Sequence, residues 1–548
     1  MSINKLPDIQ RLKIKKVLLV AVPVILFFVL LTDIAAYHLG ADINWDLLNY
    51  HFYNGYLWMH DKLISGSINT IQSYLDPLLN SFYYILISTL TPLQVNLVIA
   101  ALQSLSLTSV FFLSAIIFES SNFINKVMIS FMVSLSALFG PVFWSEIGGT
   151  MGDTLLASPV IISIMFLVLA TNTENSLRKR GYYVFLAGLL IGFVSGLKFT
   201  NMIYAVATFL SVAVVFTIIR LRYKDILLLL LVFTIATMLS FLATYWPVGW
   251  ILWASFKNPI FPYYNGLFRS PYFAPYSFHD TRWFPEHFVG YLLMPFKFCA
   301  PTVFKTSPSH PIGMELNFRT YLFAIIFILL PFYVAKQIKR ISREKCDDYK
   351  GIFVILFFVF SFVIWEIMFS YYRYIAVLEV TAPLAIMIML STVFDNFVKG
   401  RIIPVVLVFF VFALSATSVA PNWGREPFTD SYFGVNKETF INYNKSLIIV
   451  GHTPIGFVLP YLPSGDTVVG IPEKWVSFTK AFNNKYMQNL HTFNGKMYYL
   501  SEYTKSLDLV KKHASFLKMS YGITIKYNTC KAIKTNIYPI VLCAAARN

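Results

Sequence analysis

Charged residues are scarce in this sequence. Only 13% of its 548 residues are Asp, Glu, Lys or Arg, whereas soluble domains carry about a quarter. Hydrophobic residues reach 57% and are concentrated in nearly charge-free blocks. Blocks of about 20 residues match the roughly 30 Å hydrocarbon core of a bilayer. The composition excludes an ordinary soluble domain and indicates several membrane spans. The clearest blocks are 17–36, 102–118, 226–245, 321–335, 351–369 and 402–419.

Cysteine is also rare, and the four cysteines make no metal-binding motif. No small-residue cleavage site follows the first apolar block, which is too long for a signal peptide. The net charge of +17 is typical of nucleic-acid binding, but the basic residues gather at the ends of apolar blocks. A nucleic-acid site needs a contiguous basic face. We therefore expect neither a signal peptide nor a nucleic-acid partner.

Clusters of Lys and Arg predict the orientation of the spans. The run RLKIKK precedes the first block, which places the N-terminus in the cytoplasm. Placing the later clusters on the same side gives about eleven spans. The external loops are then 37–92, 144–153 and 247–317. Within the first loop, the apolar stretch 77–92 is short for a crossing and is interpreted as interfacial or re-entrant, although a crossing is left open.

The composition changes after residue 420. Residues 421–548 contain 15 Lys or Arg and 7 Asp or Glu, with no spanning block. Their patterns predict strands at 446–450, 467–470 and 497–500 and a helix at 501–514. We therefore predict a polytopic α-helical membrane protein, with a transmembrane region at 1–420 and a small external α/β domain at 421–548.

Two cysteines of this last domain are predicted to form a disulfide. Cys530 and Cys543 flank Thr535 and Asn536, which suit a hairpin turn. Disulfides persist outside the cytoplasm. Because spacing alone does not fix the required geometry, two unpaired thiols are the alternative.

The first external loop carries carboxylates among aromatic residues. If the chain is helical from residue 45 onward, Asp46, Asn49 and Tyr50 share one face. Asp42 lies one turn earlier and joins that face. Trp and Tyr suit a membrane interface, but an interfacial anchor needs neither the carboxylates nor the amide. The alternative is that Asp42 caps the helix and Asp46 is solvated.

A second acidic motif lies in the next external loop. Glu146 and Asp153 flank three glycines, and glycine permits a close approach of the backbone to a ligand. The alternative is a flexible turn in which Asp153 stabilises the start of the following helix.

This pattern resembles the GT-C superfamily of membrane glycosyltransferases, which includes oligosaccharyltransferases, protein mannosyltransferases and aminoarabinose transferases. The resemblance covers the topology of the membrane region but, as sequence, only 42–53 and 146–153. A WWDYG-type motif of the oligosaccharyltransferases is absent from the sequence. The resemblance implies a bacterial inner-membrane enzyme with an external (periplasmic) C-terminal domain. It would transfer a sugar from a polyprenyl-phosphate-linked donor, at the outer face of the membrane, to a glycan, lipid or protein acceptor.

Such a reaction needs a base for the acceptor hydroxyl and positive charge near the departing phosphate. We predict Asp46 as the base, with Asp42 as the second choice. The positive charge comes from Lys or Arg side chains or from a divalent metal. The predicted substrate-binding residues are Glu146, Asp153, Arg282, Arg319, Arg373, Asn49 and Tyr50, and a metal would draw its ligands from Asp42, Asp46, Glu146 and Asp153.

Two other functions are compatible with a polytopic chain. A transporter or a flippase of lipid-linked sugars places charged or broken-helix sites near the bilayer midplane, usually in two related halves. Here most titratable residues lie in loops and no halved repeat is visible. A non-catalytic envelope assembly protein is the third hypothesis, because a fold can outlast its activity.

Overall fold

The computed structural model describes residues 8–119, 123–278, 280–300, 302–305, 315–343, 348–394, 403–451, 454–472, 476–503 and 507–547. The chain divides into two compact units. The first unit, which we call the helical unit, comprises 1–40, 96–242 and 281–424. The second, which we call the mixed unit, comprises 41–95, 243–280 and 425–548.

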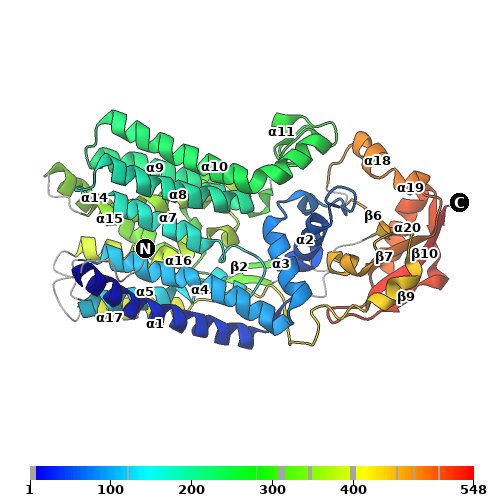
Figure 1. Cartoon of the computed structure of the whole chain (residues 1–548), viewed down its shortest axis with the longest axis horizontal. Coiled ribbons are helices and arrows are strands. Elements are labelled where there is room, and N and C mark those ends of the chain that lie inside the picture. The colour runs from blue at the N-terminus through cyan, green and yellow to red at the C-terminus, as the bar shows by residue number, and fades with distance from the viewer. Residues whose placement is uncertain are drawn as a thin grey trace. The chain divides into compact units, whose positions relative to one another are not determined.

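Most of the helical unit consists of apolar helices (Figure 1). Pairs of them pack together: α7 against α8, α9 against α15, α14 against α16 and α5 against α17. The remainder includes the antiparallel pair of strands β2 and β3. The helices are α1 (Asp8–Leu39), α4 (Pro92–Ile117), α5 (Phe123–Ala137), α6 (Pro141–Glu146), α7 (Ala157–Ala170), α8 (Leu177–Leu197), α9 (Met202–Ile218), α10 (Tyr223–Phe256), α12 (Phe288–Leu292), α13 (Met294–Lys297), α14 (Leu322–Ser342), α15 (Tyr349–Met368), α16 (Ala376–Val393) and α17 (Ile403–Ala416), and the strands are β2 (Thr302–Lys305) and β3 (Glu315–Phe318).

Eight helices among the described residues are long and apolar enough to cross a membrane. They match eight of the predicted spans, and the remaining three coincide with the shorter apolar helices α5, α7 and α17. The chain is therefore a multi-pass membrane protein, as predicted, while the number of crossings stays a prediction. The first part of the predicted external loop 247–317 is helical, because α10 continues through Pro247 to Phe256. The residue at which α10 leaves the membrane stays a prediction.

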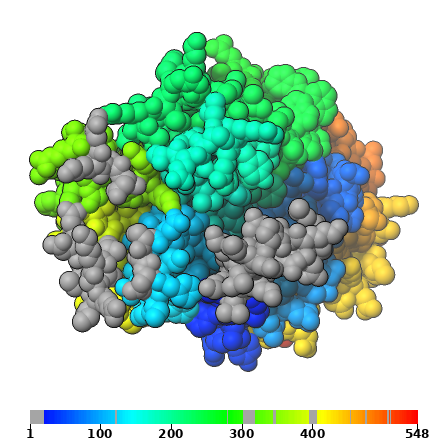
Figure 2. Space-filling view, turned by 60° about the vertical axis from the view of Figure 1, so that its left-hand side comes forward, coloured from blue at the N-terminus to red at the C-terminus, as the bar shows by residue number. Residues whose placement is uncertain are grey.

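Glycines let α8 and α10 pack closely. A methyl group added at Gly188 would lie 2.8 Å from Cβ of Ala236, and one at Gly192 would overlap the backbone of Thr237. Small residues four apart are typical of helix contacts in membranes, where backbone approach replaces the hydrophobic effect. On other faces α10 exposes Leu231, Met238 and Leu239, as a lipid-facing helix does. Figure 2 shows this part of the chain, coloured cyan to green, at the surface.

The mixed unit is built around a β-sheet and a helical hairpin. In the described residues the six-stranded sheet has the order β6-β5-β7-β10-β8, and β9 also pairs with β10. Strand β5 is parallel to β6 and β7, whereas β10 is antiparallel to β7, β8 and β9. Helix α2 packs against α3, and α20 against β8. The elements are α2 (Phe52–Met59), α3 (Leu78–Thr89), α11 (Asn265–Phe268), α18 (Lys480–Tyr486), α19 (Asn489–Thr492), α20 (Asp508–Tyr521), β1 (Ala41–Asp42), β4 (Arg425–Glu426), β5 (Leu447–Val450), β6 (Thr467–Gly470), β7 (Met497–Glu502), β8 (Ile523–Ile525), β9 (Lys531–Ile533) and β10 (Ile540–Arg547).

The C-terminal part has the α/β character that the sequence predicts, with one shifted element. The helix predicted at 501–514 begins only at Asp508. Strand β7 extends instead to Glu502, because Ser501 and Glu502 pair with Val541 and Ile540 of β10. The sheet therefore takes residues whose local pattern also suited a helix.

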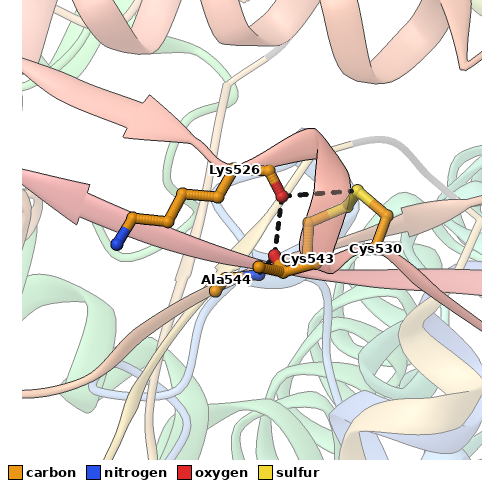
Figure 3. Close-up of a disulfide and its surroundings, with 5 residues drawn as sticks. Lys526, Cys530, Cys543 and Ala544 are labelled. Carbon is orange, nitrogen blue, oxygen red and sulfur yellow. Dashed lines mark hydrogen bonds between the residues drawn. A yellow bond between two sulfur atoms is a disulfide. The ribbon is translucent and has the colours of Figure 1, made fainter.

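A disulfide joins Cys530 to Cys543 (Figure 3). Cys530 precedes β9 and Cys543 lies within β10, in an antiparallel pair that sets Lys531 opposite Leu542. The backbone of Lys526 donates a hydrogen bond to the carbonyl of Ala544 at 2.8 Å beside the bridge. The turn that connects these strands contains Thr535 and Asn536, as the sequence predicts.

Candidate active site

Two buried carboxylates lie at the end of α6 and in the loop that joins α6 to α7. Glu146 is 1% exposed and Asp153 is 5% exposed. Oε2 of Glu146 accepts hydrogen bonds from the backbone nitrogen and the hydroxyl of Thr154, at 3.1 and 3.0 Å. Because Thr154 directly follows Asp153 in the chain, these bonds hold the two acidic residues in one folded loop.

A glutamine from α4 braces this loop. The amide nitrogen of Gln103 donates to the carbonyl of Glu146 and to the hydroxyl of Thr154, both at 2.9 Å. Its amide oxygen accepts from the backbone nitrogen of Gly148 at 2.8 Å. Gly148 has φ of +71°, a conformation that glycine adopts without steric cost. Gly148 thus supplies the backbone conformation of this turn, and Gln103 braces the turn with three hydrogen bonds.

Asp153 forms ion pairs with two cations from other parts of the helical unit. Its carboxylate lies 2.6 Å from Nζ of Lys198 and 3.2 Å from Nε of Arg373. Both oxygens of the carboxylate are thus engaged, and the charges offset the desolvation of a buried carboxylate. Lys198 also donates to the carbonyl of Met151 at 2.9 Å. The start of α7 has no side-chain cap hydrogen bond, and an electrostatic effect of Asp153 on α7 stays the alternative interpretation.

Glu146 lies in a different electrostatic environment. Burial, with a further contribution from the negative charge of Asp153, raises the pKa of Glu146. Its second oxygen, Oε1, is buried and has no hydrogen-bond partner among the residues that the structure describes. Neighbouring carboxylates with different environments are common in the active sites of enzymes that transfer protons.

Aromatic rings surround the guanidinium of Arg373. Its centre lies 5.4 Å from the ring of Tyr371, 5.6 Å from that of Tyr374 and 5.7 Å from that of Trp423. These distances permit cation–π attraction. The indole nitrogen of Trp423 donates to the hydroxyl of Ser145 at 2.8 Å. The ion pair with Asp153 and the surrounding aromatic rings together hold the side chain of Arg373 in place.

A cavity of about 190 Å³ opens beside Arg373 in the helical unit. Arg282, Lys297 and Arg373 bring three cationic side chains to its lining, among mostly aromatic and apolar neighbours. Such a lining suits a ligand that combines a phosphate with an apolar part. The other lining residues are Trp283, Phe284, Pro285, Met294, Phe298, Phe318, Ser370, Tyr371, Tyr372, Pro421 and Trp423.

The structure brings two of the three predicted arginines to this cavity. Arg282 and Arg373 line it, but Arg319 is not among its lining residues. The guanidinium of Arg319 donates to the carbonyl of Thr417 at 3.1 Å, and its backbone pairs with that of Val419. Arg319 therefore ties two segments of the helical unit together.

Sequence reasoning missed the role of Glu379 in α16. Its carboxylate accepts from the backbone nitrogens of Val142 and Phe143, at 3.1 and 2.9 Å, and from the hydroxyl of Tyr372 at 2.7 Å. It thereby fixes the start of α6, which carries Glu146. The sequence signal was that Glu379 is an ionisable residue inside an apolar span. Placing such a residue in a membrane costs free energy, and residues of this kind are usually functional.

Asp42 lies in the mixed unit and is almost wholly buried. Its two oxygens accept from the side-chain amide of Asn44, at 2.9 and 2.7 Å. Asn44 in turn accepts from the backbone nitrogen of Leu47 at 2.9 Å. Asn44 is thus the residue that caps the helix, and Asp42 orients the cap. The role of Asp42 as a second catalytic carboxylate stays a prediction.

The helix that follows contains a π-helical turn at Leu47–His51. A π-turn changes the α-helical spacing on which we placed Asp46, Asn49 and Tyr50 on one face, and such turns often occur at functional sites. Asp46 is partly buried, whereas Asn49 and Tyr50 are buried. The side-chain amide of Asn49 is 0% exposed and has no hydrogen-bond partner among the described residues. The catalytic assignment of Asp46 stays a prediction.

A divalent metal was left open as a source of positive charge. The described residues contain no group of three or more His, Cys, Asp or Glu side chains placed to hold a metal ion. Within the helical unit, the carboxylate of Asp153 is already paired with Lys198 and Arg373. We therefore derive no step through a metal.

Comparison with known proteins adds information about the fold. No family model and no curated protein matches this sequence. Among solved structures, ArnT from Cupriavidus metallidurans bound to undecaprenyl phosphate aligns with a TM-score of 0.50 at 11% identity, covering 95% of this chain and 97% of that one. The Archaeoglobus fulgidus oligosaccharyltransferase in its apo form aligns with a TM-score of 0.41 at 13% identity, covering 87% and 69%. The chain therefore has a fold similar to that of ArnT over nearly the whole length of both chains.

Proposed function

We propose that this protein is a membrane glycosyltransferase that moves a sugar from a polyprenyl-phosphate-linked donor to an acceptor hydroxyl at the outer face of the membrane. The observation that carries the proposal is the cavity with Arg282, Lys297 and Arg373 in its lining. Arg373 is at the same time paired with Asp153 in the acidic loop. The fold likeness to ArnT, which was solved with undecaprenyl phosphate, supports the same class of donor.

The reaction explains why the cations are needed. The oxygen of the acceptor hydroxyl forms a bond with the anomeric carbon of the donor sugar while the bond from that carbon to the phosphate oxygen breaks. The polyprenyl phosphate leaves with the bonding electrons, and a carboxylate base takes the hydroxyl proton. Arginine and lysine side chains stabilise the negative charge that develops on the phosphate. In this scheme Asp46 is the base and the cavity holds the phosphate.

Two features oppose a purely structural role for Arg373. Its side chain is only 8% exposed and yet lines the cavity. A cation in an outer loop also runs against the usual bias towards cytoplasmic Lys and Arg. A buried charge is costly unless it is paired, and a second anion beside Asp153 would complete its neutralisation.

Binding of undecaprenyl phosphate to the purified full-length chain tests the proposal. We expect Arg373→Ala to weaken this binding about 10- to 100-fold, the effect of removing a charged hydrogen bond. Since Arg373→Ala also leaves Asp153 with one cation fewer, Lys297→Gln provides a second variant at an exposed position of the same lining. Native mass spectrometry of the protein with added lipid measures the affinities.

The matched control is Arg222→Ala. Arg222 is 82% exposed, pairs with Asp225 and lies outside the cavity lining. Its replacement should leave lipid binding unchanged. Equal binding by wild type, Arg373→Ala and Lys297→Gln, with all three chains folded, would refute the assignment of the cavity to the donor phosphate.

A further inference from the structure

A second and larger hollow lies in the mixed unit. It has a volume of about 570 Å³, within the range of roughly 300–1,000 Å³ that ligand sites occupy. Segments far apart in the sequence line it: the end of α2 with the turn that follows, Ile251 near the end of α10, and the stretch from Lys485 to Asn489. We call it the α2–α18 groove.

The floor of the α2–α18 groove is rigid and apolar. Leu57 and Leu63, which line it, are 1% and 4% exposed. Leu63 belongs to the hydrophobic core of the mixed unit, and Trp58 and Tyr486 pack against that core with part of their surface open. The hydroxyl of Tyr486 donates to the carbonyl of Ser255 at 2.7 Å, which fixes the ring. Two partly buried aromatic rings therefore border the groove, and that of Tyr486 is fixed by a hydrogen bond.

Its rim is polar but has little net charge. Asp61 and Lys485 contribute one charge of each sign, and Gln488 and Asn489 contribute side-chain amides. The ammonium of Lys485 already lies 5.0 Å from the ring of Tyr272 and 3.2 Å from its hydroxyl. This groove lacks the three cations of the cavity in the helical unit, so its chemistry does not favour a phosphate.

The combination matches the chemistry of a sugar chain. A pyranose presents C–H groups on its faces and hydroxyls around its edge. Aromatic rings have electron-rich faces that attract C–H groups. Amide and carboxylate side chains pair with hydroxyls, since an amide offers two donors and an acceptor side by side. Trp58 and Tyr486 supply the first kind of contact, and Asp61, Gln488 and Asn489 the second.

We infer that the α2–α18 groove binds a neutral oligosaccharide, which is the acceptor or part of it. The identification as acceptor rests on the proposed glycosyltransferase function, whereas the binding of an oligosaccharide does not. A peptide acceptor is the competing occupant, and the test below separates it from a glycan.

The full-length protein in lipid nanodiscs is applied to an array of short neutral oligosaccharides built of hexose or N-acetylhexosamine units, and to an array of peptides. We expect binding to a subset of the oligosaccharides. Trp58→Ala should weaken that binding about tenfold or more, as loss of an aromatic contact does, and Gln488→Ala should weaken it by about 2- to 10-fold, as loss of one hydrogen bond does. Gln488 is exposed, so its replacement leaves the fold intact.

The control is Tyr527→Ala, which removes an aromatic ring that is 44% exposed in the same unit but lies outside the groove. It should bind as wild type does. Binding to peptides alone, to no oligosaccharide, or equally by wild type and both groove variants would overturn the inference.

Measuring the binding of undecaprenyl phosphate to the same variants distinguishes the two proposals. The groove variants should retain its binding, and Arg373→Ala should retain oligosaccharide binding. If the oligosaccharide arm fails while the lipid arm succeeds, the groove assignment is wrong and the proposed function stands. The opposite result would leave a glycan-binding membrane protein without a donor site.

Discussion

At the scale of single residues, the candidate site depends on side chains that compensate one another. Asp153 is stabilised by Lys198 and Arg373, while Glu146 has backbone and hydroxyl donors on only one of its oxygens. The two cations offset the burial of the Asp153 carboxylate, whereas the environment of Glu146 favours its protonated form.

Asp46→Asn tests the predicted base. The substitution keeps the size of the side chain and removes its ability to take a proton. Sugar transfer should fall by about two orders of magnitude or more, while the amount of protein in the membrane stays the same. Mass spectrometry of surface glycans and lipid-linked sugars measures the change. Glu438→Gln, at an exposed position, is the matched control, and full transfer by Asp46→Asn would exclude Asp46 as the base.

Asp76, a half-buried carboxylate of the mixed unit, gives a prediction about pH. Burial raises the pKa of Asp76 from 3.8 to about 8, although the backbone nitrogen of Leu78 donates to its Oδ1. Its Oδ2 is buried without a hydrogen-bond partner among the described residues. In the folded protein Asp76 thus stays protonated over a range in which the unfolded chain is ionised. Its contribution to stability is complete below pH 3.8 and is lost as the pH rises towards about 8.

Asp76→Asn should flatten this dependence, because asparagine resembles the protonated form at every pH. The melting temperature of the purified full-length chain, followed across this pH range, should fall less in the variant than in wild type. Asp430→Asn, at an exposed position of the same unit, should leave the wild-type slope unchanged. Identical slopes for wild type and Asp76→Asn would show that Asp76 is not the group responsible.

At the scale of elements, long-range pairing decides where helices and strands begin and end. Strand β7 continues to Glu502 because β10 offers backbone partners there, and α10 continues ten residues beyond Trp246 despite Pro247. The disulfide also connects two elements. It joins Cys530, directly before β9, to Cys543 in β10, and β10 pairs with β7, β8 and β9.

Removal of this disulfide should destabilise the mixed unit. The bridge spans a sequence separation of 13, for which the loss of chain entropy in the unfolded state gives about 3 kcal/mol. We expect the double variant Cys530→Ser, Cys543→Ser to unfold at a lower denaturant concentration than wild type. A reducing agent should shift wild type in the same direction and leave the variant unchanged.

Counting thiols provides the independent check. The sequence has four cysteines, so unreduced, denatured wild type should show at least two reactive thiols fewer than the reduced, denatured chain. Four reactive thiols would mean that the bridge does not form in the isolated protein.

At the scale of the whole molecule, the residues group in a way that chain order does not suggest. The segments 41–95 and 243–280, which include most of the predicted loop 37–92 and the first part of the predicted loop 247–317, form one compact unit with 425–548. The predicted base Asp46 and the α2–α18 groove belong to this unit, whereas the acidic loop and the cationic cavity belong to the helical unit. In the proposed reaction, acceptor and donor would accordingly be bound by different units.

Labelling with a membrane-impermeant thiol reagent tests the predicted orientation. In a background with Cys299 and Cys346 replaced by serine, Lys512→Cys should react in intact cells or spheroplasts and Lys179→Cys only after the membrane is opened. Both positions are exposed, so burial does not block the reagent. Reaction of Lys179→Cys from outside would reverse the predicted topology and remove the site from the outer face.

The sequence by itself determined the class of the protein and the positions of most membrane helices. A span is recognised from its own length and apolarity, because a helix in lipid must satisfy its backbone groups internally. The sequence also indicated Glu146, Asp153 and Arg373 as site residues, since acidic loops and an external arginine are unusual in an apolar chain. It identified the cysteine pair from the local hairpin that separates Cys530 and Cys543.

Only the tertiary structure decided which of these residues meet. Arg373 and Asp153 are 220 residues apart and form an ion pair. Gln103 and Glu379 position the acidic loop from two further helices. Glu379 stands out in the sequence as an ionisable residue inside an apolar span, but its partners in α6 do not. A charge or an amide has the same sequence pattern whether it caps a helix, as Asn44 does, or braces a loop. The difference arises from the desolvation and the partners that packing imposes, and these depend on the whole chain.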